Sequence, residues 1–160
     1  MNPQTHTVHR ASSREIEEAW ALIKEYYAVV GVVAREDRAE FEQQYFAQGA
    51  GVWLAIVECK AVGCVALRKL PRQANCGEIK RMYVQSSYRG TGIAGSLLAA
   101  LEKYALERGY DWLYLDTAAS MQAAAKFYSR NCYKPCERYN SNPQAVLFMR
   151  KRVDASCTSL

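Results

Sequence analysis

The apolar residues of this chain follow a helical period before about residue 50 and a strand period after it. Residues 12–31 ("SSREIEEAWALIKEYYAVVG") space their apolar side chains three or four positions apart, at Ile16, Trp20, Ile23, Tyr27 and Val30. We therefore expect a helix that Ser12 and Glu15 open as a capping box and that Gly31 ends. A second helix is expected from about Arg38 to Gln48.

Beyond residue 50 the apolar residues run together or alternate, which is typical of strands. Residues 51–70 ("GVWLAIVECKAVGCVALRKL") predict a hairpin with its turn at Cys59 and Lys60. Residues 76–84 ("CGEIKRMYV") predict a third strand whose side chains alternate between two faces. A helical stripe then returns and ends at Gly109, with apolar positions at Ile93, Leu97, Leu98, Leu101 and Ala105.

Three further segments complete the pattern. Residues 110–117 ("YDWLYLDT") predict a strand, residues 120–131 ("SMQAAAKFYSRN") a helix with Ser120 as its candidate cap, and residues 133–151 two strands separated by a loop. This order predicts an α/β (α+β) fold, with a mixed, largely antiparallel central sheet of about seven strands flanked by about four helices. We expect a single domain over residues 1–152 and a frayed tail over residues 153–160.

Composition narrows the class of protein. The chain has 160 residues, a length that fits one domain. No apolar run approaches the length of a membrane helix, and the N-terminal segment lacks the apolar block of a secretory signal. We therefore expect no membrane partner and a cytoplasmic location. The net charge of +5 comes without any block of like charges, so a small anionic ligand is expected rather than nucleic acid.

The metal-ligating residue types are few and scattered. The six cysteines form no C-x-x-C pair and are expected to be buried thiols. The only histidines, His6 and His9, lie together near the N-terminus. No metal site is expected.

Three glycines interrupt the segment "YRGTGIAGSLL" just before its helical stripe. A turn between a strand and a helix N-terminus presents unpaired backbone N–H groups, and the helix dipole adds partial positive charge. Glycines at 90, 92 and 95 let a phosphate approach those amides, and Arg89 adds a fixed charge. The segment therefore predicts a pyrophosphate-binding loop.

Other interpretations of the loop fit less well. No Gly-Lys-Ser/Thr follows it, so it is not a Walker P-loop. The dinucleotide fingerprint G-x-G-x-x-G does fit residues 90–95, and Asp116 lies near the position of the expected ribose-binding acid. However, an antiparallel meander before the loop is foreign to that fold. A glycine-rich turn without any ligand is the remaining alternative.

Residues 89–94 (Arg-Gly-Thr-Gly-Ile-Ala) carry the motif Arg or Gln, two residues, Gly, one residue, Gly or Ala. With "EIKRMYV" before it and "AAAKFYSRNCY" after it, this motif resembles the GCN5-related N-acetyltransferase superfamily over nearly the whole chain. Cys132 stands where the family has glycine, so we expect the helix-to-strand corner to differ. The ending "YNSNP" resembles a subgroup of small bacterial-type members.

The resemblance implies acetyl transfer from acetyl-CoA to a primary amine of a small molecule or peptide, by direct attack in a ternary complex. The strand edge at Met82, Tyr83 and Val84 would pair with the pantetheine arm, and the amide of Met82 or Val84 would polarise the thioester carbonyl. We also count Ser120 as a candidate cofactor-binding residue. The pyrophosphate would contact the backbone of Arg89, Gly90, Thr91, Gly92, Ile93, Ala94 and Gly95.

Two side chains are candidates for the proton transfers. Tyr128 falls at the family's usual position for the general acid, and a phenol can protonate a departing thiolate. Glu78 is the candidate base, because strand alternation would place it on the same face as Met82. The alternatives are a core aromatic residue for Tyr128 and an ion pair with Lys80 for Glu78.

For several further residues, the sequence allows both a functional and a structural interpretation. The loop residues Asn140 and Asn142 could touch substrate or form a plain turn. Lys80 and Arg81 could contact an acidic substrate or lie on a solvated strand edge. An aromatic set could wall a small pocket, although most of its members are expected in the core; it comprises Tyr26, Tyr27, Trp53 and Tyr139.

Two other functions compete with a small-molecule acetyltransferase. A non-catalytic acetyl-CoA-binding regulatory module would keep the loop and lose the acid, so Tyr128 argues against it. A protein lysine acetyltransferase would favour an acidic groove, which the net charge does not suggest. Exposed C-terminal strands could pair between two chains, which would give a homodimer.

Overall fold

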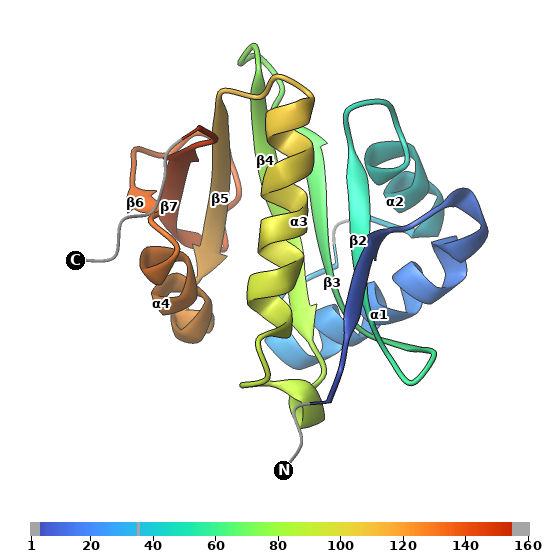
Figure 1. The fold of residues 1–160 in the computed structure, drawn as a ribbon. Helices are drawn as coiled ribbons and strands as arrows, with labels where there is room; N and C mark the ends of the chain where they lie inside the picture. Colours follow the sequence, from blue (N-terminus) through green and yellow to red (C-terminus); the bar gives the residue numbers. More distant parts are fainter. Residues whose placement is uncertain (1–3, 35, 155–160) are drawn as a thin grey trace.

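The strands form one sheet in the order β1-β2-β3-β4-β5-β7-β6 (Figure 1). The structure is a computed structural model, which describes residues 4–34 and 36–154. The strands are β1 (Thr7–Arg10), β2 (Gly51–Val57), β3 (Lys60–Lys69), β4 (Cys76–Val84), β5 (Trp112–Ala118), β6 (Lys134–Pro135) and β7 (Ala145–Arg152). The helices are α1 (Ile16–Val30), α2 (Arg38–Tyr45), α3 (Ile93–Glu107) and α4 (Gln122–Arg130), with short 3-10 turns η1 (Ser13–Glu15) and η2 (Ser86–Tyr88). In the described chain only β4 and β5 pair in parallel, so the predicted mixed, largely antiparallel fold is confirmed.

The ends of the elements follow the local signals with small shifts. The backbone N–H of Ser12 donates to the Glu15 carboxylate at 2.8 Å before α1, and Gly31 ends that helix with a left-handed φ of 73°. Two predicted boundaries were wrong by a few residues. α2 ends at Tyr45 because the amide of Phe46 closes its last turn, and the hairpin turns at residues 58 and 59.

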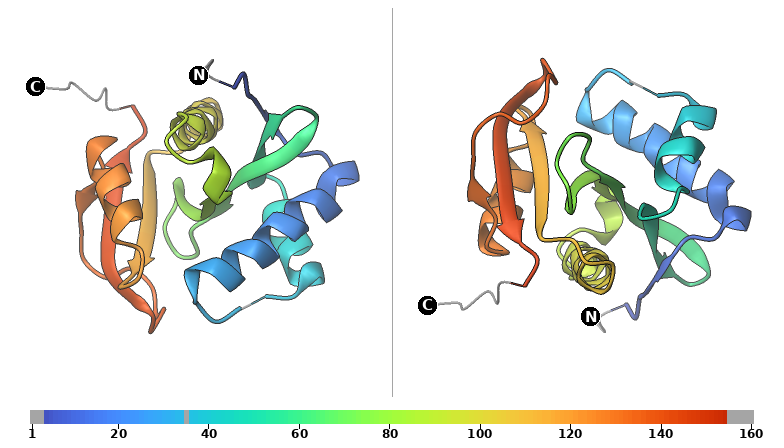
Figure 2. Two further views of the ribbon diagram at one scale, coloured as in Figure 1. Left: turned by 90° about the horizontal axis from the view of Figure 1, so that it is seen from below. Right: turned by 90° about the horizontal axis from the view of Figure 1, so that it is seen from above.

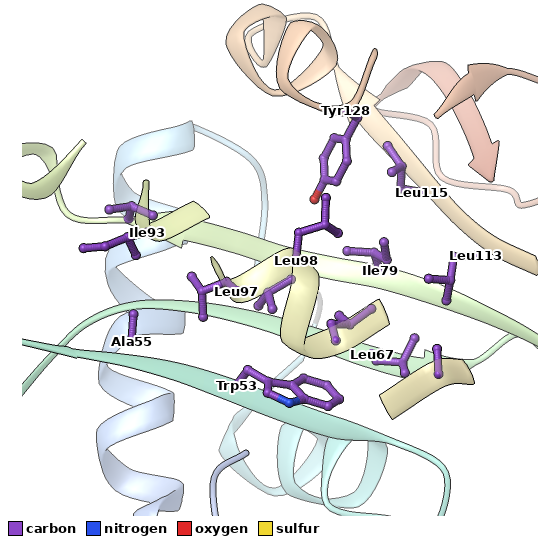
Figure 3. Packing of buried hydrophobic residues seen from close by; sticks show 14 of the residues in the cluster. Trp53, Ala55, Leu67, Ile79, Ile93, Leu97, Leu98, Leu113, Leu115 and Tyr128 are labelled. Atoms are coloured by element: carbon purple, nitrogen blue, oxygen red, sulfur yellow. The ribbon is translucent and has the colours of Figure 1, made fainter. Parts of the chain in front are cut away.

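Helices cover both faces of the sheet, with α3 on one face and α1 and α2 on the other (Figures 1 and 2). Strand alternation divides the apolar side chains between two cores. On β2, for example, Trp53 and Ala55 join the core beneath α3, and Val52 and Leu54 join the core beneath α1. Figure 3 shows the first of these cores. The five predicted apolar positions of α3 are all buried in it.

A β-bulge in β4 reverses this alternation part-way along the strand. Arg81 has a φ of 58°, and the β3–β4 register shifts beside it. Ile79 packs beneath α3, but Tyr83 packs beneath α1, although unbroken alternation would put both on one face. The expectation that Glu78 and Met82 share a face is therefore wrong, because the extra residue at the bulge lies between them.

β4 and β5 pair over a short distance only. Cys76–Glu78 pair with Trp112–Tyr114, and no further pairing joins these two strands in the described chain. The remaining length of β4, up to Val84, thus has an unpaired edge on the side facing β5. This edge and the helix that follows it position the candidate site.

The corner after α4 keeps glycine-like geometry. Cys132 has a φ of 70°, its amide donates to the Ser129 carbonyl at 3.1 Å, and the Tyr133 amide donates to the Tyr128 carbonyl at 3.0 Å. This is a Schellman motif, normally closed by glycine. The expected change of the corner is wrong, since the cysteine adopts the left-handed conformation at a cost of about 1 kcal/mol.

The cysteines do not all match the expectation of buried thiols. Cys64 and Cys76 are buried and free, but Cys59 is exposed on the hairpin turn and Cys132 takes part in a disulfide bond. In the predicted tail, Val153 donates its amide to the Asp111 carbonyl at 3.0 Å, and residues 155–160, with Cys157, lie outside the described residues. No helix within the described ranges is long and apolar enough to span a membrane.

Candidate active site

The glycine-rich loop connects η2 to the N-terminus of α3. Gly90 and Gly92 both have left-handed φ values, 74° and 85°, which glycine adopts without strain. A Cβ built on either residue, or on Gly95, meets no heavy atom within 4 Å. The loop is therefore open toward solvent, while the Ile93 side chain behind it is buried in the core at 2% exposure.

The amides of this loop are available to a ligand. Among the described residues, none of the backbone N–H groups from residue 90 to residue 95 donates to a backbone carbonyl. Converging free amides at a helix N-terminus favour an anion, so the loop fits a diphosphate. Arg89 is exposed beside them and is anchored by a bond from its Nε to the Val84 carbonyl at 2.9 Å. His6 also lies here, with Nε2 at 2.8 Å from the hydroxyl of Ser96 in the first turn of α3.

The unpaired edge of β4 presents a backbone donor beside the loop. Gln85 donates its N–H to the Val62 carbonyl at 2.9 Å, on the β3 side. Because successive residues of an extended strand point their N–H groups to opposite sides, the N–H of Val84 points away from β3. Met82 and Val84 thus lie on an edge where a bound chain can pair as an additional strand.

A cavity of about 230 Å³ opens beside this edge, between β4 and β5. Met82 and Tyr128, two of the predicted site residues, both line it. Its other walls come from α1, the α1–α2 loop, α2, β3 and the β6–β7 loop. Side chains far apart in the sequence therefore form one small chamber.

Tyr128 reaches this chamber from α4. Its ring points away from the helix toward Leu98, with the hydroxyl at the far end (Figure 3). The residue is 4% exposed, and this burial raises the pKa of its hydroxyl above the ordinary tyrosine range. The phenol is therefore protonated at neutral pH and can donate a proton to a group in the cavity.

Glu78 lies behind the cavity wall. Its side chain is 1% exposed, and Glu78 is not one of the described residues that line the cavity. One carboxylate oxygen accepts from Arg68 Nε at 2.9 Å, and the other accepts from the Tyr139 hydroxyl at 2.7 Å and from Asn140 Nδ2 at 3.2 Å. Glu78 also forms an ion pair with Lys80, whose Nζ lies 3.5 Å from the carboxylate, as one of the predicted alternatives for Glu78 stated.

The "YNSNP" loop closes over Asp116 at the end of β5. Asn140 Nδ2 donates to the Asp116 carboxylate at 2.6 Å, Asn142 Nδ2 lies at 3.4 Å, and Lys80 Nζ lies at 3.4 Å. Burial alone would raise the pKa of Asp116, but Lys80 and the two amides more than offset it, and the net pKa is lowered. Asp116 is thus a stable carboxylate. The asparagines form a turn, since Asn140 Oδ1 accepts from the Asn142 amide and Asn142 Oδ1 from the Gln144 amide, both at 3.1 Å, and they also line the cavity.

Arg81 projects from the bulge into the cavity. Its Nε donates to Glu36 at 3.1 Å, and its guanidinium carbon lies 5.0 Å from the centre of the Tyr27 ring and 5.8 Å from that of Tyr26. Its side chain is 12% exposed and that of Lys80 is 10% exposed. The alternative of a solvated strand edge is therefore wrong for both residues.

The remaining predicted residues lie around these two features. Tyr83 turns its side chain to the α1 face, where its hydroxyl donates to Glu25 at 3.3 Å, so only its backbone lies on the β4 edge. Ser120 is exposed and donates to the Val30 carbonyl at 3.3 Å. The expectation that it caps the next helix is wrong, because α4 starts at Gln122 with Met121 in the cap position. Within the described ranges no group of three or more acidic, histidine or cysteine side chains could hold a metal ion.

Comparison with known families identifies the family of the chain. The model of the acetyltransferase (GNAT) family matches residues 16–132. The chain belongs to this family. It is 39% identical to the N-acetylaspartate synthetase of Xenopus tropicalis over 101 residues, which make up 62% of this chain and 37% of that protein. The chain thus matches little more than a third of that relative's length.

Solved structures of GNAT proteins share the fold. A GNAT-family acetyltransferase from Staphylococcus aureus Mu50 superposes with a TM-score of 0.81 at 23% identity, over 94% of this chain and all of that one. The paia N-acetyltransferase of Thermoplasma acidophilum, solved in complex with coenzyme A, superposes with a TM-score of 0.71 at 18% identity, over 92% and 99% of the two chains.

The cavity residues of this GNAT protein that sequence reasoning missed include Glu36, Gln44 and Arg68. For Arg68 a signal existed, because alternation places it on the same face of β3 as the buried Cys64 and Ala66. A charged side chain at such a position requires a partner or a function. Glu36, in a charged loop, carried no comparable signal.

Proposed function

We propose that the protein transfers the acetyl group of acetyl-CoA to the primary amine of a small molecule or peptide, by direct attack in a ternary complex. The observation that carries this proposal is the open loop of free amides at residues 90–95, next to a cavity that contains the Tyr128 phenol. The first feature suits the diphosphate of coenzyme A, and the second suits an amine of limited size.

The binding residues would act mainly through their backbone. The free amides from Gly90 to Gly95 would hold the diphosphate. Arg89, whose own amide donates to the Ser86 carbonyl at 3.3 Å, would supply the adjacent positive charge. The open edge at Met82, Tyr83 and Val84 would hold the pantetheine arm by strand-like pairing. Ser120 is exposed near the end of α1 and stays a predicted contact of the cofactor.

The bound cofactor supplies an activated thioester, and the chain supplies its orientation and two proton-handling groups. The N–H of Val84, directed away from β3, would donate to the thioester oxygen as negative charge develops there. As the C–N bond forms and the C–S bond breaks, the Tyr128 hydroxyl would donate its proton to the departing sulfur. The proton that the attacking amine loses would then return to the tyrosinate, so the products are a neutral amide and the free thiol. Burial raises the pKa of Tyr128 and makes it a weaker acid than a free phenol, so the proposal of this role rests on the position of the hydroxyl in the cavity rather than on its pKa.

Glu78 stays a prediction for the base. Its saturated carboxylate favours a different contribution, in which it fixes Asn140 and Lys80 at the cavity wall without touching the amine. A proton could reach it only through one of those neighbours or a water molecule. We therefore propose Glu78 as a positioning residue and give its test in the Discussion.

Names of relatives support the acetyl transfer. The frog protein described above is named for acetylation of aspartate, and the Thermoplasma protein was solved with coenzyme A. Each name describes its own protein, and for the present chain these names support the reaction type.

The test is release of free coenzyme A from acetyl-CoA in the presence of a broad panel of amines. We expect at least one amine to be acetylated, and Tyr128→Phe to lower kcat about 100-fold or more while calorimetry shows unchanged affinity for coenzyme A. Tyr133→Phe is the matched control, because it removes a hydroxyl that is bonded to Glu102 at 2.8 Å outside the cavity. Binding of coenzyme A without acetylation of any amine would instead support the non-catalytic binding module.

A further inference from the structure

The charged groups of the acceptor cavity are arranged in opposite pairs. Three cationic side chains from β3 and β4 line the cavity, and three carboxylates pair with them, Glu78 being shared between Arg68 and Lys80. The pairs are Arg68–Glu78 at 2.8 Å, Lys80–Asp116 at 3.4 Å and Arg81–Glu36 at 3.1 Å. A polycationic acceptor would add unbalanced positive charge to this buried site, whereas a ligand that carries both signs would preserve the balance.

Arg81 has the geometry of a carboxylate-binding residue. Glu36 occupies its Nε, and the rings of Tyr26 and Tyr27 hold the planar group in place. Several N–H donors of the guanidinium remain for a ligand, in the fork arrangement that matches a carboxylate. Arg68 lines the same cavity and adds a second guanidinium on the β3 side.

The backbone at Arg81 gives an independent reason to assign it a function. Its φ of 58° lies in the left-handed region, where glycine would be free of strain. A long, charged side chain held in such a conformation and turned into a cavity is typical of functional sites. The bulge places Arg81 in the chamber, and a regular strand would not present both Lys80 and Arg81 there.

From these contacts we propose that the acceptor is a free amino acid, whose carboxylate binds Arg81 and Arg68 while its amino group faces Asp116 and Tyr128. The inference rests on the proposed acetyltransferase function and specifies its substrate class. A cavity of about 230 Å³ is below the range of about 300–1,000 Å³ that is typical of drug-sized ligands, which agrees with an acceptor of this size.

The test compares acceptors that differ only in the carboxylate. Coenzyme A release is measured with the twenty amino acids, with the α-amide and the decarboxylated amine of the best one, and with spermidine and a lysine peptide. We expect an amino acid to be the best acceptor and its amide to show a kcat/KM lower by about 10- to 100-fold. An amide or amine that is used equally well, or preference for spermidine or the peptide, would overturn the inference and leave the acetyltransferase function standing. If no amine of any class is acetylated, both fail.

A variant pair assigns the effect to Arg81. The double variant Arg81→Gly, Glu36→Gln removes the cation, its partner charge and the backbone strain together, so it should fold. We expect its KM for the amino acid to rise about 10- to 100-fold, its affinity for coenzyme A to stay unchanged, and its discrimination between acid and amide to disappear. Arg152→Gln, on an exposed arginine that pairs with Asp154 away from the cavity, is the control that should retain full discrimination. Retained discrimination in the double variant would refute the assignment to Arg81.

Discussion

The loop at residues 90–95 and the cavity beside β4 bind by opposite means. The loop is one continuous stretch, exposed at all three of its glycines, and it offers backbone amides rather than side chains. The cavity gathers side chains from both faces and both halves of the sheet, and its charged groups are nearly all buried and paired. Both regions use a left-handed backbone conformation, but with different results. Gly92, at φ 85°, leaves the loop amides accessible, whereas Arg81, at φ 58°, places a long side chain in the cavity.

This difference separates the roles of backbone and side chain in one protein. A diphosphate can be held by main-chain groups at a helix N-terminus, so the loop depends on conformation more than on residue chemistry. Selection of an acceptor requires side-chain charges in a fixed arrangement, and this depends on tertiary packing. Changes to the two regions should therefore have separable effects on cofactor affinity and on acceptor use.

The largest effect is expected from Gly92→Ala. A Cβ at this position would stand where a phosphate must approach the amides, and we expect the affinity for coenzyme A to fall about 100-fold, measured by calorimetry. Gly109→Ala is the matched control, because Gly109 also has a positive φ, 78°, and open space around it, at the other end of α3. Both variants should lose similar stability from backbone strain, and only Gly92→Ala should lose affinity. Equal losses of affinity would remove the loop from the site.

A smaller effect is expected from Glu78→Gln. If Glu78 positions Asn140 and Lys80, kcat/KM should fall about 10-fold while the acidic limb of the pH–rate profile keeps its midpoint. Glu102→Gln, which disturbs a comparable carboxylate bonded to Tyr133 and Lys151, should change neither quantity. A fall of more than about 100-fold with loss of the acidic limb would instead identify Glu78 as the base.

The smallest effect concerns stability and pH. The pKa of Asp116 is lower in the folded protein than in the unfolded chain, so its contribution is complete above about pH 4 and is lost as the pH falls through the folded-state pKa. We expect Asp116→Asn to lower the free energy of unfolding by about 1 kcal/mol at pH 7 in urea denaturation, with the difference vanishing in acid. Asp154→Asn, at a fully exposed carboxylate, should show no measurable change. A difference that is constant with pH would contradict the ionic origin.

Local signals predicted the fold and the position of the glycine-rich turn before α3. The apolar stripe of α3 lies within one continuous segment, from Ile93 to Ala105, and the glycine pattern lies directly before it. The bulge at Arg81 could not be predicted, because it depends on how β4 pairs with β3 rather than on the residues of β4 alone. For the same reason the sequence could not show that Glu78 would be buried by Tyr139 and Asn140, about sixty positions along the chain.

The short pairing between β4 and β5 has a mechanical consequence. Within the described residues, β4 and β5 pair over three residues of each strand, and this short contact joins the two halves of the sheet (Figure 2). A ligand bound along the open edge of β4 would lie between β4 and β5 and would fix the angle between these two strands. A ligand bound between β4 and β5 should therefore reduce motion of one half of the sheet relative to the other. Slower amide hydrogen exchange in the outer strands of the sheet would measure this effect.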